Sequence, residues 1–162
     1  MSTQTALAAC ARLAASLDPY AVLALADRTI VVDAGGNSVL SVAADGTVSL
    51  LAVIPKSGKN QAVPSSIALG PDGAFYVGEL AEGAGRGKAR VWKVPAAGGA
   101  PTVHASGFTM ITGLAFGPDG SLFVTEMATN PRAEDFAGDV VRVRPDGART
   151  RLGTGKLTAP QG

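Results

Sequence analysis

Short apolar runs separated by turn residues recur along most of the chain. The continuously apolar run Ile67 to Leu69 is followed by Pro71 to Gly73, where proline fixes φ and glycine tolerates positive φ. The next run, Ala74 to Val77, is β-branched and aromatic, as strands are. A third run, Arg90 to Val94, alternates apolar and polar residues, so one of its faces is expected in a core. The pattern predicts antiparallel strands joined by tight turns.

This unit of four strand signals occurs three times. Its copies start at Pro19, Pro64 and Ile111, which are 45 and 47 residues apart, and Pro160 opens what looks like a fourth copy after a further 49. Four strands repeated at such a spacing are typical of β-propeller blades. We therefore predict an all-β fold, a β-propeller of about three four-stranded antiparallel blades, with a β-sandwich as the alternative.

The repeat also predicts how the chain is divided. Residues 19–63, 64–110 and 111–159 would form the blades, and residues 160–162 the start of a further blade. Propellers usually close with about 4 to 8 blades, so three leave the ring open. Uncovered end blades present apolar faces to water, which favours association. We expect self-association or further blades to close the ring.

Residues 1–18 stand outside the repeat. Their alanine-rich stretch 5–17 predicts a short helix, which Asp18-Pro19 would end. Leu7 to Cys10 is similar to a lipoprotein processing box, but no Lys or Arg precedes Cys10, so a helical cysteine is favoured. Because Cys10 is the single cysteine, an internal disulfide is excluded.

Charge and hydropathy limit the kinds of molecule that the chain is expected to bind. The 14 Lys and Arg residues nearly balance the 13 Asp and Glu residues, and no basic block stands out. The electrostatic footprint of a nucleic-acid-binding protein is therefore missing. No apolar run approaches the roughly 20 residues that a membrane-spanning helix needs. We expect neither a nucleic-acid partner nor a membrane span.

Several stretches resemble the ScyD/ScyE family of β-propeller proteins, and more distantly the NHL-repeat and SMP-30/gluconolactonase-like propellers. They include Val31 to Ser38, Gly70 to Leu80 and Leu114 to Leu122. The resemblance implies a six-bladed propeller, often exported, from a family associated with scytonemin biosynthesis and without an established activity. The chain would correspond to the C-terminal half of an extracellular or periplasmic parent.

Candidate site residues lie where the repeat brings loops together. Asp33, Glu79 and Glu126 follow the second strands of the three copies, on the face where the first strands begin. Three carboxylates there are the kind of ligand that Ca²⁺ prefers. The alternative is that each carboxylate accepts backbone N–H bonds from its own loop. The same face would carry, at the starts of the first strands, Tyr20, Ser65, Thr112 and Gln161.

Two further residues carry candidate chemistry. Arg86 lies in a glycine-rich loop that can wrap an anion, although its spacing matches no dinucleotide or phosphate motif and an ordinary surface loop is favoured. His104, the single histidine, falls in an outer strand with no partner that would make it a general base.

The functional prediction is a non-enzymatic module that binds a small molecule or protein on the loop face. The alternative is a metal-dependent lactonase-like or lyase-like hydrolase, with Asp33, Glu79 and Glu126 in its cation site.

Overall fold

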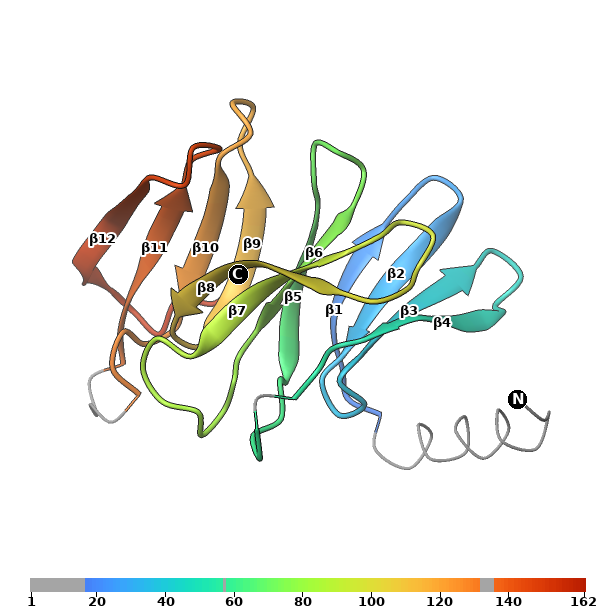
Figure 1. Ribbon diagram of the computed structural model, residues 1–162, viewed down its shortest axis with the longest axis horizontal. Helices are drawn as coiled ribbons and strands as arrows, with labels where there is room; N and C mark the ends of the chain where they lie inside the picture. Colours follow the sequence, from blue (N-terminus) through green and yellow to red (C-terminus); the bar gives the residue numbers. More distant parts are fainter. Residues whose placement is uncertain (1–16, 57, 132–135) are drawn as a thin grey trace.

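The computed structural model describes residues 17–56, 58–131 and 136–162, and the described residues form three four-stranded antiparallel sheets (Figure 1). The first sheet contains β1 (Pro19–Ala24), β2 (Arg28–Asp33), β3 (Ser38–Ala43) and β4 (Val48–Val53). The second contains β5 (Pro64–Leu69), β6 (Phe75–Glu79), β7 (Ala89–Val94) and β8 (Thr102–Phe108). The third contains β9 (Ile111–Phe116), β10 (Leu122–Glu126), β11 (Ala137–Val143) and β12 (Arg149–Thr158).

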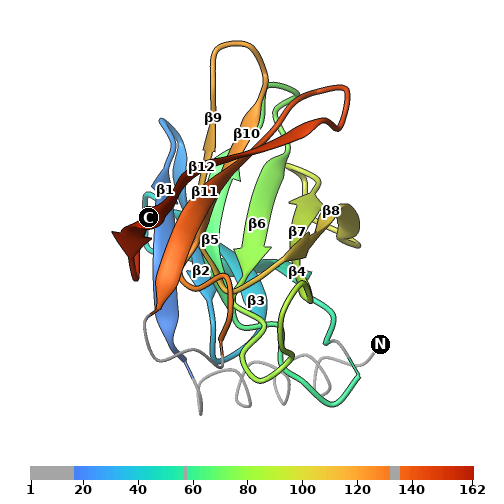
Figure 2. The same cartoon turned by 90° about the vertical axis from the view of Figure 1, so that its left-hand side faces the viewer.

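The all-β prediction is confirmed, because the sheets are blades of a partial β-propeller. Each sheet keeps its strands in chain order, and the innermost strands β1, β5 and β9 lie next to one another. Figure 2 shows the third blade in front of the second, as in a stack. The helix predicted within residues 1–18 falls almost wholly on residues 1–16, outside the described part of the chain. In the described ranges no helix is long and apolar enough to cross a membrane.

The third blade has the longest of the three outer strands. The outer strand β12 has ten residues and ends at Thr158. The reason is a register shift between Gly138 and Val140, which lets β11 pair with a second part of β12, Leu157 and Thr158. The long final hairpin therefore arises from an irregular pairing that hydropathy does not encode.

The strand register places one carboxylate at the same point of every blade. Asp33 pairs with Pro19, Glu79 with Pro64, and Glu126 with Ile111. The second strand of each blade thus ends beside the start of its inner strand. All three carboxylates consequently lie at one end of the blades, where the β2–β3, β6–β7 and β10–β11 connections emerge.

Apolar side chains fill the two spaces between blades. Ile30, Val32 and Val39 of the first blade pack with Phe75 and Val77 of the second. On the other side of the second blade, a separate cluster includes Tyr76, Val91, Phe108, Ile111 and Val124. Fully burying a Val or Phe side chain contributes about 1.5–3 kcal/mol, so blade stacking makes a large contribution to stability.

Candidate functional site

A groove of about 660 Å³ runs along the inner strands β1, β5 and β9. Every side chain that lines it is uncharged, and its polar members are Tyr20, Ser65, Ser66, Thr112, Thr125 and Gln161. The structure therefore brings together Tyr20, Ser65, Thr112 and Gln161, which the sequence placed at the starts of successive inner strands. Apolar residues such as Ile67 and Leu114 complete the lining.

The Ser65 and Thr112 hydroxyls at the strand starts bond to backbone carbonyls of the segment that follows each blade. Ser65 Oγ donates to the carbonyl oxygen of Ile111 at 2.5 Å, and Thr112 Oγ1 donates to the carbonyl oxygen of Pro160 at 2.9 Å. Because a hydroxyl has one proton, each of these groups has only lone pairs left for a ligand. Toward a bound molecule they act as hydrogen-bond acceptors.

Ser66 and Thr125 are the polar residues of the groove that the sequence analysis missed. Ser66 is 5% exposed, and its Oγ has no hydrogen-bond partner among the described residues. A buried hydroxyl without a partner costs about 1–3 kcal/mol, so a polar ligand atom or a water that reached it would be stabilised. Its position next to Ser65 was the available signal, but its lack of a partner depends on the packing around it.

Asp33 is held within the first blade. It is buried, its Oδ1 accepts a hydrogen bond from the Asp18 backbone N–H at 2.8 Å, and Ser38 Oγ donates to Oδ2 at 3.4 Å. The carboxylate thus ties the end of β2 to the residue that precedes β1.

Glu79 is held by two side chains of β7. Arg90 donates to it from Nε at 2.6 Å and from Nη2 at 3.2 Å, and the Trp92 indole Nε1 donates at 2.9 Å. The Arg90 guanidinium also lies 4.5 Å from the centre of the Trp92 ring. The fully buried carboxylate therefore has a bidentate cationic partner and a third donor.

Glu126 belongs to a buried pair of carboxylates. It lies opposite Asp139 in the β10–β11 pairing, and Arg151 Nη1 donates to both side chains at 2.6 Å. The Thr109 backbone N–H donates to Glu126 Oε1 at 2.5 Å. Burial raises the pKa of Glu126, and Arg151 counteracts the rise. Asp139 Oδ1 has no partner among the described residues.

The three carboxylates are not brought to one point. Each is buried in its own blade, and none lines the groove. In residues 17–56, 58–131 and 136–162 no three His, Cys, Asp or Glu side chains are grouped so that they hold a metal ion. Arginines bind Glu79 and Glu126 directly, so in this arrangement the set does not fit a shared Ca²⁺.

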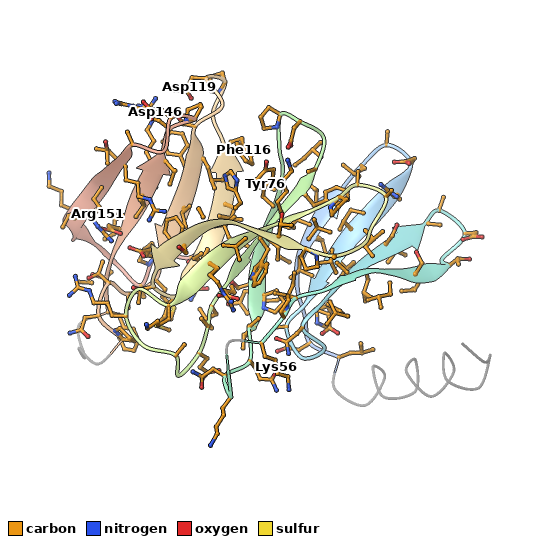
Figure 3. The ribbon with its side chains drawn as sticks, in the orientation of Figure 1. Lys56, Tyr76, Phe116, Asp119, Asp146 and Arg151 are labelled. Carbon is orange, nitrogen blue, oxygen red and sulfur yellow. The ribbon has the colours of Figure 1, made fainter. Side chains whose placement is uncertain are left out.

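Arg86 and His104 also lie outside the groove. Arg86 is exposed in the β6–β7 connection. His104 lies on the outer strand β8 with its ring edge-on to Tyr76 at 4.7 Å, and burial lowers its pKa. Figure 3 shows Tyr76 close to Phe116, and their rings are 4.8 Å apart between the second and third blades.

Stacked four-stranded blades with a groove along their inner strands define a partial β-propeller. No protein-family model and no curated protein sequence matches the chain. Among solved structures, the fold is similar to virginiamycin B lyase from Staphylococcus aureus, with a TM-score of 0.60 and 14% identity over 85% of this chain and 42% of that chain.

Two other propellers are similar to the same extent. A gluconolactonase from Xanthomonas campestris gives a TM-score of 0.59 and 20% identity over 83% of this chain and 46% of that chain. Regucalcin, a calcium-binding protein from Agrobacterium tumefaciens, gives a TM-score of 0.60 and 18% identity over 86% of this chain and 47% of that chain. The chain thus spans less than half the length of each of the three. At these identities the likeness shows the propeller fold.

Proposed function

We propose that the chain is a non-enzymatic binding module of the ScyD/ScyE type whose groove takes an uncharged, hydroxyl-bearing small molecule. The observation that carries the proposal is the lining itself, which is free of charged side chains and carries polar groups on all three inner strands. The motif resemblance of Val31 to Ser38 and Gly70 to Leu80 supports the family assignment.

The chemistry of the groove favours such a ligand for three reasons. Ser65 and Thr112 present acceptors, and the Gln161 amide supplies both donors and an acceptor. The Tyr20 ring, which is 49% exposed, offers a flat apolar surface with a polar end. A volume of about 660 Å³ lies in the range of roughly 300–1,000 Å³ typical of small-molecule sites.

D-Glucose is a suitable first probe, because it is neutral, rich in hydroxyls and related to the substrate class named for the gluconolactonase. Titration followed by protein NMR is expected to show saturable shifts of groove residues. Tyr20→Ala should weaken binding at least tenfold, whereas Arg86→Ala, outside the groove, should leave it unchanged. No saturation, or equal effects of the two substitutions, would refute the assignment of this ligand class to the groove.

A metal-dependent lactonase-like or lyase-like hydrolase is the second candidate. The likeness to a gluconolactonase and to a calcium-binding propeller favours it. It requires Asp33, Glu79 and Glu126 to leave their present partners and bind a cation. If they do, Ca²⁺ should raise the melting temperature by mass action and permit hydrolysis of glucono-1,5-lactone, and Glu79→Gln should remove both effects. Neither effect is expected of a binding module.

A further inference from the structure

The first blade presents an apolar face with no neighbour among the described residues. This first-blade face consists of Val22, Val31, Leu40, Val42 and Leu50. Val22, Val31, Leu40 and Leu50 are successive cross-strand partners, so they form one row across all four strands. Val22 is 69% exposed and Leu50 is 52% exposed. Side chains of this kind in a continuous row mark an interaction surface.

The corresponding positions of the other two blades are covered by the preceding blade. By strand register, Val31 corresponds to Val77 and Val124, and both of these are fully buried between blades. Leu40 corresponds likewise to Trp92 and Val141, which are also buried. What covers this type of face in the molecule is therefore the opposite face of another blade.

The third blade has such an opposite face uncovered. This third-blade face includes Phe123, Val140 and Leu152. Leu152 is 42% exposed, whereas the residues at its position in the first and second blades, Ala52 and Ala105, pack into the two clusters between blades. The two end faces of the chain are thus the two halves of a blade–blade contact.

We infer that a second copy of this chain covers both faces. The first-blade face of each copy packs against the third-blade face of the other, which gives two identical contacts in a closed, two-fold symmetric dimer. A second copy has about the right size to complete the ring, because one chain spans 42–47% of the solved propellers to which it is similar. The inner strands of the second copy would then complete the groove into a channel.

The last three residues, 160–162, occupy the position that β1 of a second copy would take in this dimer. The Thr112 bond to the Pro160 carbonyl repeats the Ser65 bond to the Ile111 carbonyl, so residues 160–162 lie where the inner strand of a next blade starts. A Cβ on Gly113 would lie 2.7 Å from Gly162 Cα, which shows how closely they approach. In the dimer the start of β1 from the second copy takes this place, and residues 160–162 are displaced.

Sedimentation equilibrium over a concentration series tests the inference. The 162-residue chain is expected to reach twice its 16.2 kDa mass. Val22→Arg and Leu152→Glu should each give a monomer, because each alters both contacts of a homodimer. An equimolar mixture of the two should regain the dimer, since one of its two contacts is then unaltered. Val103→Lys, an exposed position of β8 outside both faces, is the matched control.

A chain that ends at Ala159 should dimerise more tightly than the full chain. Recovery of the dimer in the mixture also shows that neither substitution acts by unfolding. A monomer at every concentration would overturn the inference and point to further blades of a longer chain as the cover. Open-ended oligomers, a mixture that stays monomeric, or weaker dimerisation of the shortened chain would overturn it as well.

Discussion

The buried Glu79 cluster offers a direct test of what the repeated carboxylates do. Glu79→Ala removes the acceptor of two Arg90 hydrogen bonds and one Trp92 hydrogen bond. Hydrogen bonds to a charged group contribute about 1.5–3 kcal/mol each, and breaking a buried ion pair costs about 3–5 kcal/mol. Because 19% of the Arg90 side chain remains exposed, water recovers part of the loss. We expect the free energy of unfolding to fall by about 3–4 kcal/mol.

Urea denaturation followed by tryptophan fluorescence measures this loss. Trp92 is the single tryptophan and belongs to the cluster, so its emission reports on the perturbed region. With a urea slope of about 2 kcal/mol per molar, the midpoint should fall by roughly 1.5–2 M. Glu82→Ala, in the exposed part of the same connection, is the matched control and should change the midpoint little. A fall below about 0.5 M for Glu79→Ala would refute the structural role, since it corresponds to only about 1 kcal/mol.

Three further predictions concern other buried or paired groups. Because burial raises the pKa of Glu126 above its ordinary 4.5, its contribution favours the folded state at low pH and is lost as pH rises through the raised value. Glu126→Gln should therefore make the melting temperature depend less on pH between pH 4 and 8. An unchanged dependence on pH would contradict this. The Lys93 hydrogen bond holds the pKa of Asp72 at about 2, so its contribution is lost as pH falls from about 4 to 2. Asp72→Asn should remove that acid-side loss in circular-dichroism melts, and a loss equal to that of the unaltered chain would count against the pairing. Gly78→Ala should destabilise the chain by about 1–3 kcal/mol in urea, because the new Cβ would lie 2.5 Å from Ile111 Cγ2 and from Ser66 Oγ.

The blades were predictable because turn chemistry and strand type recur together. Pro71 to Gly73 returns in the third copy as Pro118 to Gly120, and both turns place their glycine at positive φ. The inner-strand starts Tyr20, Ser65 and Thr112 followed from the same alignment. In these turns and strands the local sequence preferences agree with the overall fold.

The partners of the carboxylates were not predictable from the repeat. The position is the same in every blade, but the donor comes from before β1 for Asp33, from β7 for Glu79 and from β12 for Glu126. For Glu126 the donor Arg151 pairs with Val141, so it comes from two strands away in the same sheet. A pattern of residue types records the carboxylate, whereas its role is decided by whichever strand brings a donor to it.

Ser66 shows the same limit within the groove. Its neighbour Gly78 leaves room for both the Ser66 hydroxyl and the Ile111 side chain of the next blade, and any larger residue would collide with them. The hydroxyl is buried only because β5, β6 and β9 meet at this point. Its lack of a partner is therefore a property of stacked blades and of no single repeat. Because the groove is lined by residues of all three blades, its shape also depends on the blade–blade contacts.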